Sequence, residues 1–398
     1  MKRIERLLPP GVKDIFGAPA RHLVRLNRRL GAHFERWGYA PVIPPTFEYF
    51  DNLMRGFDEA FSREVYRFVD PQGHLVALRP DMTVPIARMV ATKLYDQPMP
   101  LRFSYAAPVF RYVEPRAGRQ REFWQAGAEL IGANTAEADA EIIALLVATL
   151  ETCGLSTFQV NVGHMGFLHG VLAQLETPPP NLEYIRRAID RKNRRVLALE
   201  LERAGLEGRV RAALEALPTL WGGVEVLERA ARLAPNGVAG KAIERLAQVY
   251  ELTRAYGIAE RVTLDLGEVR GMNYYTGITF EAFTPGSGYA IAGGGRYDSL
   301  LERYGAALPA VGFAVQVELV LLVLEREGLL PEEPPADALM ACCGHAACLA
   351  DLRDRRARGE RILLDVRPRS AQELIEEAAR LGIPAVLVCG RRLEVPRA

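Results

Sequence analysis

The sequence predicts an α+β fold in which an antiparallel sheet is flanked by helices. Short apolar runs bounded by turn residues alternate with longer segments of helical periodicity. A stretch at about 180–256 has continuous helical periodicity with many Arg and Glu residues, which indicates a helical insertion. Prolines at 328–335 precede alternating strand and helix patterns, which predict a small C-terminal α/β domain.

The first 180 residues contain helix, strand and hairpin patterns in turn. Leu23, Leu26, Leu30 and Phe34 recur at helical spacing and predict a helix over 21–37, which Gly38 is placed to end. Prolines close a strand predicted at 39–43. The further predictions are a hairpin of 65–69 with 75–78, a helix at 84–94, strands at 101–113 and 122–131, a helix at 137–150 and a strand at 158–162.

The strand pattern returns after the helical insertion. Predicted strands lie at 262–266, 279–283, 289–292 and 309–315, and a helix follows at 317–327. The C-terminal strands are predicted at 338–342, 361–364 and 385–388. The domains predicted from this order are a first domain over 1–328, a linker over 329–336 and a truncated α/β domain over 337–398.

Composition and charge limit the classes of partner. The 398 residues are 49% hydrophobic and 25% charged, which is typical of a globular chain. The net charge of +1 argues against a partner held by a strong basic field, such as bulk nucleic acid or an anionic membrane. Five scattered cysteines argue against a disulfide framework and favour a cytoplasmic location. We expect neither export nor membrane insertion, because no apolar run has the required length.

Charged and aromatic residues lie on or beside several of the predicted strands. Side chains an even number of residues apart share one face of a strand, so Gln125 and Glu129 are expected to point the same way. An amide and a carboxylate on one face can line one polar pocket, although a single polar strand residue is more often solvent-facing. The other residues of this kind are Asp81, Arg111, Arg270, Tyr275 and Tyr297.

Seven sequence blocks occur over roughly residues 7–324. In order they are GVKDIFG, GYAPVIPPTFE, ALRPDMT, VFRYVEPRAGRQREFWQAGAELIG, RGMNYYTG, AGGGRYDSLLERYG and PAVGFAV. In these blocks and in their order the chain resembles the histidyl-tRNA synthetase family, and RGMNYYTG at 270–277 is close to the histidine-recognition signature of that family. The resemblance implies a class II aminoacyl-tRNA synthetase-like fold. Because GYAPVIPPTFE matches the dimer-forming motif, we also expect a homodimer core.

The resemblance implies a pocket for free histidine. A histidine ammonium needs carboxylates, its carboxylate needs a guanidinium, and its imidazole needs phenol and amide partners. Asp81 is one methylene shorter than the Glu that the family has there. The implied roles are ammonium binding by Asp81 and Glu129, carboxylate binding by Gln125 and Arg270, imidazole binding by Tyr275 and Tyr297, and packing by Tyr274.

The groups with which the family handles ATP are largely replaced. Arg111 keeps the position of the arginine that binds the α-phosphate, and we include it in the predicted ligand pocket. Val113 stands where the family has the Glu that reads adenine, and Glu114 beside it would point to the opposite face. Gln316 replaces a Gly, and Leu319 replaces an Arg that contacts adenine and the triphosphate. We therefore expect adenylate formation to be lost.

This combination resembles the ATP phosphoribosyltransferase regulatory subunit family, a synthetase paralogue family that binds histidine. The resemblance implies a non-catalytic chain in a hetero-octamer with short-form catalytic ATP phosphoribosyltransferase, the first enzyme of histidine biosynthesis, and feedback inhibition by histidine. We expect no cofactor, and no tRNA partner because 337–398 contains no aromatic residue for base stacking. The alternatives are an active histidyl-tRNA synthetase and a free-standing histidine sensor with another partner.

One cysteine-rich stretch has residue types that bind soft metals. It contains Cys342, Cys343, His345 and Cys348, at a predicted strand-to-helix turn. Because no second paired cluster follows in the sequence, we interpret these residues as buried small thiols and predict no metal.

We also predict structural rather than functional roles for a run of three glycines and for two histidines. The glycine run 293–295 lacks the strand-to-helix context of a dinucleotide site, so we predict close backbone packing there. His164 and His169 have no nucleophile or carboxylate partner that the sequence places beside them, which favours structural roles for both.

Overall fold

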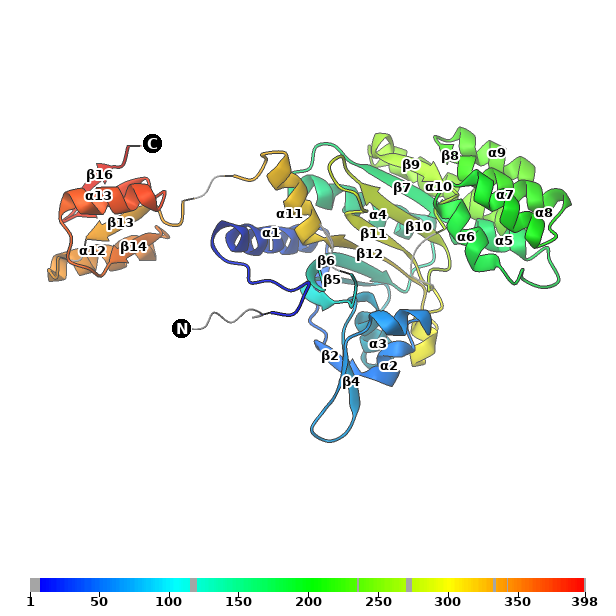
Figure 1. The fold of residues 1–398 in the computed structure, drawn as a ribbon, viewed down its shortest axis with the longest axis horizontal. Helices are drawn as coiled ribbons and strands as arrows, with labels where there is room; N and C mark the ends of the chain where they lie inside the picture. Colours follow the sequence, from blue (N-terminus) through cyan, green and yellow to red (C-terminus); the bar gives the residue numbers. More distant parts are fainter. Residues whose placement is uncertain are drawn as a thin grey trace. The chain divides into compact units, whose positions relative to one another are not determined.

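The chain folds into two compact units, and a computed structural model describes residues 8–114, 120–234, 236–269, 274–331, 334–341 and 343–396. The first unit comprises Met1–Lys13 and Leu23–Leu329, and the second comprises Asp14–His22 and Leu330–Ala398. Figure 1 shows the ribbon of each unit. Within the described ranges, no helix combines the length and the apolar character that crossing a bilayer requires.

A nine-stranded sheet forms the centre of the first unit. Its strands, in spatial order, are β1 (Ala40–Pro41), β5 (Leu101–Phe110), β6 (Glu122–Ile131), β12 (Ala310–Gln316), β11 (Ala292–Arg296), β10 (Ile278–Phe283), β7 (Gln159–His164), β9 (Val262–Asp265) and β8 (Trp221–Gly222). All pairings from β5 through to β7 are antiparallel. The predicted antiparallel sheet is therefore confirmed at its centre, whereas β1 joins β5 and β9 joins β7 in parallel.

Long helices pack on this sheet and are set by local sequence signals (Figure 1). Helix α4 (Ala136–Cys153) begins where the Thr135 side chain accepts the N–H of Ala138, and it ends at Gly154, whose φ is 101°. Helices α4 and α11 (Val317–Arg326) both contact β6 and β12. Helix α1 (Gly17–Arg36) brings the ring of Phe34 to within 6.2 Å of the Phe313 ring of β12. These helices confirm the predicted flanking layers.

The predicted helical insertion is present at the β8 end of the sheet. It contains α6 (Leu182–Asp190), α7 (Arg194–Arg203), α8 (Gly208–Ala216), α9 (Glu225–Leu233) and α10 (Gly237–Ala255). Helix α5 (Met165–Leu172) packs against α8 and α10. The all-helical prediction is wrong at one point, because β8 lies inside this segment and pairs with β9. Two strand residues between helices are too short a run to interrupt the helical periodicity.

A smaller three-stranded sheet carries the predicted hairpin. Its order is β2 (Phe47–Tyr49), β4 (Leu75–Leu78) and β3 (Arg67–Val69). The turn is set by the Asp70 carboxylate, which accepts the N–H groups of Gln72 and His74 at 2.9 and 2.8 Å. Helix α2 (Phe50–Met54) follows β2, and α3 (Thr83–Lys93) follows β4. The apolar side of α3 packs in a core that includes Tyr105 of the large sheet, which fixes the start of α3 beside that sheet.

The second unit is a small α/β fold. Its sheet has the order β14 (Ile362–Asp365), β13 (Ala338–Ala341), β15 (Ala385–Val388) and β16 (Arg391–Glu394), and its described helices are α12 (Ala346–Ala357) and α13 (Ala371–Arg380). Alternate strand residues feed two hydrophobic clusters, one with α13 and one with α12. The sequence prediction omitted β16, because all four of its residues are exposed and three are charged.

The predicted strand at 289–292 is displaced in the structure. The strand β11 begins only at Ala292 and runs through the glycine triplet to Arg296. A Cβ at Gly294 would collide with the carbonyl oxygen of Gly312, and one at Gly295 would lie 2.7 Å from the carbonyl oxygen of Ile278. The prediction of close backbone packing at 293–295 is therefore confirmed. The strand was placed too early because glycine has a low strand propensity.

Candidate functional site

A cavity of about 220 Å³ lies against one face of the large sheet. This volume is below the roughly 300–1,000 Å³ of most small-molecule sites, which favours a ligand of metabolite size. Strands β6, β10, β11 and β12 contribute to the lining. The polar and aromatic lining residues are Asp81, Thr83, Arg111, Gln125, Glu268, Tyr274, Tyr275, Thr279, Phe280, Glu281, Tyr297, Phe313 and Gln316.

The strand register places polar side chains on the face that the cavity occupies. Gln125 and Glu129 lie on the same face of β6, as predicted, opposite Gln316 and Gly312 of β12. A Cβ at Gly312 would collide with the Glu129 carboxylate, so only glycine lets that carboxylate lie flat on the neighbouring strand. The same alternation brings Thr279 of β10 to this face.

Asp81 and Arg111 bring opposite charges to the lining of the cavity. Asp81 is 3% exposed, and its carboxylate accepts the backbone N–H of Val84 at 3.1 Å and the hydroxyl of Tyr274 at 3.4 Å. Burial raises the pKa of Asp81 to about 6, while the Arg111 guanidinium opposes this shift. Arg111 follows β5 and donates from Nε to the carbonyl of Pro80 at 2.8 Å. The pair presents one acid and one cation to a zwitterionic ligand.

Glu129 lies behind the cavity wall and is fully buried. One carboxylate oxygen accepts the hydroxyl of Thr83 at 2.8 Å and that of Tyr105 at 3.4 Å, and the other accepts the hydroxyl of Tyr297. Burial raises the pKa of Glu129 to about 8, although the hydrogen bonds from Tyr297 and Thr83 oppose this shift. Since Thr83 and Tyr297 themselves line the cavity, Glu129 fixes the direction of their hydroxyl groups.

Three buried polar atoms around the cavity have no hydrogen-bond partner among the described residues. They are Oε1 of Gln125, Oγ1 of Thr279 and Oε1 of Glu268. Burial raises the pKa of Glu268 to about 8, and Glu281 acts in the same direction. Buried polar groups are nearly always paired, so these three atoms are available to a polar ligand or to water in the cavity.

Most of the predicted ligand residues meet at this cavity. Asp81, Arg111, Gln125, Tyr274, Tyr275 and Tyr297 line it, Glu129 lies behind it, and Arg270 falls outside the described residues. Sequence reasoning did not name Thr83, Glu268, Thr279 or Glu281. The even spacing of Thr279 and Glu281 in a predicted strand was a signal of the same kind as that of Gln125 and Glu129.

Three positions distinguish this chain from the ATP-using synthetases that it resembles, and they are Val113, Gln316 and Leu319. Gln316 lines the cavity and donates from Nε2 to the carbonyl of Ala290 at 3.4 Å, so a side chain occupies the place predicted for a glycine. Leu319 is only 5% exposed and packs as an apolar residue of α11. Val113 is half-buried and lies two residues beyond Arg111. Val113 and Leu319 have no hydrogen-bonding group, and Gln316 has only a neutral amide, so none of the three supplies a positive charge for phosphate.

The histidine and cysteine predictions have different outcomes. The ring of His164 accepts the N–H of Gly166 at 3.0 Å and caps α5, which confirms a structural role. The prediction of buried thiols is wrong, because Cys343 is half-buried and Cys389, which the prediction omitted, is exposed and lies near it. Exposed turn cysteines cannot be distinguished from buried ones by sequence spacing. Cys342 is outside the described residues.

Comparison with known proteins identifies a matching family model and close relatives of this chain. A family model described as histidyl-tRNA synthetase matches residues 11–320. A protein of Desulforamulus reducens named ATP phosphoribosyltransferase regulatory subunit is 41% identical over 96% of this chain and 95% of its own length. One of the same name from Moorella thermoacetica is 42% identical over 94% and 96%.

Solved structures give the same relationship. The crystal structure of an ATP phosphoribosyltransferase regulatory subunit/histidyl-tRNA synthetase from Bacillus halodurans has a TM-score of 0.84 at 29% identity and covers 98% of this chain and 99% of its own. A histidyl-tRNA synthetase from Nostoc shares the fold, with a TM-score of 0.83 at 21% identity over 99% and 97%. The chain therefore belongs to the ATP phosphoribosyltransferase regulatory subunit family, whose fold is that of histidyl-tRNA synthetase.

Proposed function

We propose that this chain is a non-catalytic subunit that a short-form ATP phosphoribosyltransferase requires for activity, and that it conveys inhibition by histidine. One observation supports this above the others. The cavity keeps charged groups that suit a free amino acid, while Val113, Gln316 and Leu319 provide neither the carboxylate nor the guanidinium that the family uses for ATP. A subunit that binds an amino acid without activating it has the properties of a sensor.

The proposed ligand is histidine in the cavity on the large sheet. Its ammonium would pair with Asp81, and its carboxylate would lie toward Gln125 and the guanidinium of Arg111. The imidazole would lie among the tyrosine rings, where the hydroxyl of Tyr297 is oriented by Glu129. This differs from the role expected for Glu129 from the sequence, since the buried carboxylate reaches the ligand through Thr83 and Tyr297.

Inhibition requires that histidine bind two states of the assembly with different affinity. Bound histidine would pair its ammonium with Asp81 and its carboxylate with Arg111. A shift of the segment that carries Asp81 relative to the sheet would therefore change the free energy of histidine binding. This segment leads directly into α3, which packs in the core beneath the small three-stranded sheet. We propose that α3 transmits histidine binding to the catalytic partner.

The test is reconstitution with a purified short-form catalytic subunit. We expect phosphoribosyl transfer only when both chains are present, with progressive inhibition by histidine. The Asp81→Asn variant should still activate the partner but require roughly tenfold to 100-fold more histidine, which corresponds to one charge-assisted hydrogen bond. Asp70→Asn, a change in the exposed hairpin turn, serves as the matched control and should leave the inhibition curve unchanged. Equal curves for the two variants would contradict the proposed ligand site.

The competing function is that of an active histidyl-tRNA synthetase, which the family model and the shared fold favour. It predicts histidine-dependent exchange of pyrophosphate into ATP by this chain alone. We expect no exchange above background, because Leu319 cannot replace a phosphate-binding arginine. Measurable exchange would establish the synthetase reading and reject the regulatory one.

We also propose a homodimer core built on the small three-stranded sheet and the strand before it. Large apolar side chains are exposed there, at Ile43, Phe47, Tyr49, Phe68 and Val69. An exposed apolar patch of this kind is typical of an interaction surface. Light scattering of the purified chain should give twice the mass of one chain, and a monomer mass at micromolar concentration would reject this part of the proposal.

A further inference from the structure

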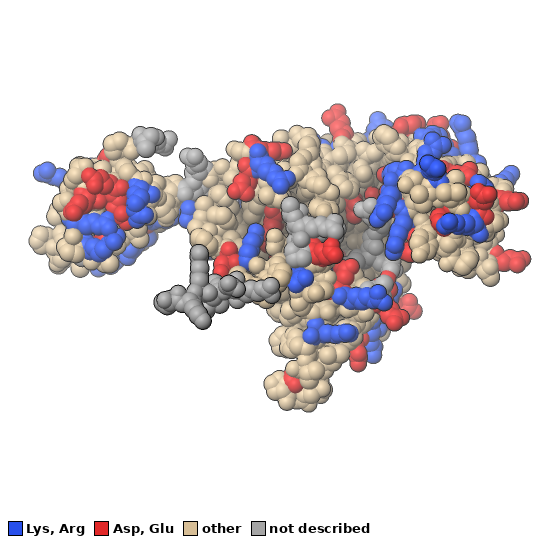
Figure 2. All heavy atoms as spheres, viewed as in Figure 1, with Lys and Arg blue, Asp and Glu red and all other residues tan. Residues whose placement is uncertain are grey.

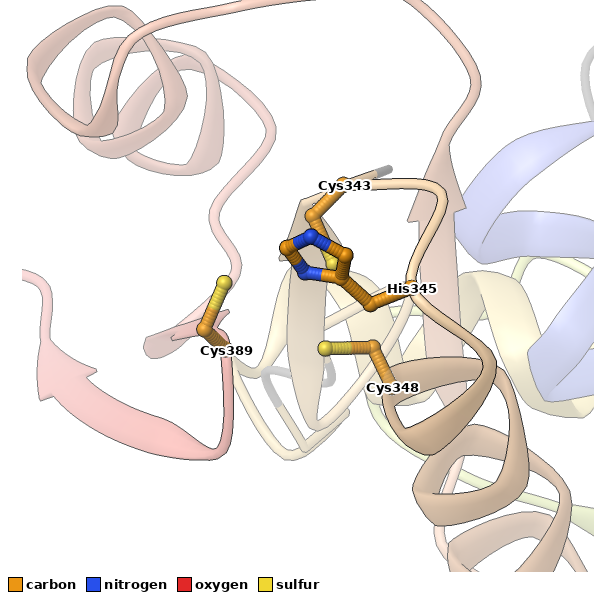
Figure 3. A group of neighbouring side chains, drawn as sticks. All are labelled: Cys343, His345, Cys348 and Cys389. Carbon is orange, nitrogen blue, oxygen red and sulfur yellow. The ribbon is translucent and has the colours of Figure 1, made fainter.

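Four side chains with metal-binding atoms meet in the second unit. They are Cys343, His345, Cys348 and Cys389, and one ligand atom from each lies within 4.8 Å of all the others. Figure 3 shows Cys343, His345 and Cys348 on one strand-to-helix connection, facing Cys389 on a neighbouring turn. The three cysteines are free thiols.

The sheet topology brings the two segments together. Strands β13 and β15 are parallel neighbours, so their carboxyl ends reach the same edge of the sheet. Cys343 and His345 follow β13, Cys348 lies in the first turn of α12, and Cys389 follows β15 directly. Residues that are distant in the sequence are therefore held side by side by strand pairing, before any ligand is considered.

Cys389 occupies a backbone position that does not favour cysteine. Its φ is 45°, and the next residue, Gly390, has φ 79°. The two residues form the turn between the paired residues Val388 and Arg391 of the β15–β16 hairpin. Turns with positive φ at both central positions favour Asn, Asp or Gly at the first of them. A cysteine at such a position, with its sulfur near two other thiols, points to a role for the side chain.

We propose that these four residues form a structural zinc site. Three thiolates and one imidazole are a complete tetrahedral ligand set for Zn²⁺, with Zn–S distances of about 2.3 Å. Sulfur atoms around such an ion lie about 3.8 Å apart, so the group needs to contract by only about 1 Å. Calcium and magnesium prefer oxygen ligands, which this group lacks.

A zinc ion at this site would stabilise the exposed edge strand β16 of the second unit. All four residues of β16 are exposed, so this edge strand is attached mainly through its pairing with β15. A bond network from the β13–α12 connection to Cys389 would hold the hairpin at its turn. Because protein atoms fill all four positions, the ion has no open position for water or substrate, and its role is stability. This site does not depend on the function proposed for the large sheet.

The first test is the metal content of the full-length chain. Protein purified without chelators from zinc-supplemented cells should contain about one zinc per chain by elemental analysis. Cys389→Ser and Cys343→Ser should each lower zinc to background, while the matched control Cys153→Ser, a buried thiol of the other unit, should retain it. A full complement of zinc in both ligand variants, a disulfide among the three thiols, or stoichiometric iron or copper instead of zinc would overturn the proposal.

Cobalt substitution tests the ligand set without relying on a variant that folds poorly. Co²⁺ added to the chelator-treated wild-type chain should give the visible bands of a tetrahedral ion together with a thiolate charge-transfer band in the near ultraviolet. Zinc should then displace these bands at equimolar concentration. Cobalt spectra typical of octahedral oxygen coordination would overturn the proposal.

Replacement of Cys389, the turn residue with positive φ, should change the melting temperature in opposite directions with and without zinc. In Cys389→Gly the replacement suits the positive φ, so without metal this variant should melt at a higher temperature than the wild type. With zinc the order should reverse, because only the wild type retains the fourth ligand. A variant that is more stable than the wild type under both conditions would overturn the proposal.

Discussion

Two fully buried carboxylates of the first unit, Glu129 and Asp139, are held in opposite ways. Asp139 of α4 forms ion pairs with Arg296 at 2.7 Å and with Arg245 at 3.0 Å. Glu129 is contacted by hydroxyl groups, and these belong to Thr83, Tyr105 and Tyr297. Burial raises the pKa of both carboxylates, but cations compensate the charge of Asp139 whereas only neutral donors meet Glu129.

The two carboxylates therefore differ in the charge of the groups that contact them. The ion pairs of Asp139 tie α4 to the end of β11 and to α10. Burial raises the pKa of Glu129 to about 8, and because its partners are neutral, a charge that enters the cavity would change this pKa. Burial alone does not distinguish the two carboxylates, whereas the charge of their partners does.

The largest effect is expected from Asp139→Asn. The substitution leaves Arg296, which is 3% exposed, without its main counter-charge in the protein interior. Removing one partner of a buried ion pair costs about 3–5 kcal/mol of unfolding free energy. Urea unfolding of the chain should show this loss. The matched control Glu183→Gln breaks an exposed pair with Arg187 and should change stability by less than about 0.5 kcal/mol. Similar losses in the two variants would show that Asp139 is not the buried anchor described here.

Glu129→Gln should change how the free energy of unfolding depends on pH. At acidic pH it should change the free energy of unfolding much less. The folded pKa is about 8 and the usual value is 4.5, so between these values the folded chain binds a proton that the unfolded chain lacks. Stability from this group is therefore full below about pH 4.5 and is lost as the pH rises to about 8. The neutral amide removes this contribution, and the stability curve should become flatter across that window by up to about 1.4 kcal/mol per pH unit.

The residual slope of the Gln variant comes from other buried acids. Burial raises the pKa of Asp81 to about 6, that of Glu318 to about 7 and that of Glu268 to about 8, so all three act in the same direction as Glu129. Chemical unfolding at several pH values between 4.5 and 8 measures the difference between the variant and the wild type. Parallel curves for the two proteins would mean that Glu129 is ionised in the folded chain.

The sequence predicted the sheet, its flanking helices and most of the cavity, because ordered blocks and strand spacing carry that information. Even spacing placed Gln125 and Glu129 on one face, and the register confirms it. It did not predict that Glu129 lies behind the wall, since depth depends on Gly312 of another strand and on Tyr297 of a later loop. Nor did it connect Cys389 with Cys343, because only the pairing of β13 with β15 brings their segments together.

These failures share a physical cause. Local patterns report which face a side chain occupies, whereas depth, partners and metal geometry come from strands that are adjacent only in space. The two-residue β8 and the charged β16 were missed for the converse reason, because their pairing is imposed by neighbouring strands rather than by their own propensity.

The smallest effect on stability is expected from a change at Gln125, a buried polar residue that lines the cavity. Its Oε1 has no hydrogen-bond partner among the described residues, although the side chain is only 6% exposed. Gln125→Met removes this unpaired acceptor at similar volume, so stability should stay within about 1 kcal/mol of the wild type or improve. Histidine affinity, measured by calorimetry, should nevertheless fall by roughly tenfold, because the ligand carboxylate loses the N–H groups that the Gln125 amide can donate. A variant that loses stability but keeps its affinity would instead mean that Gln125 is a structural residue, and the ligand would have to lie elsewhere in the cavity.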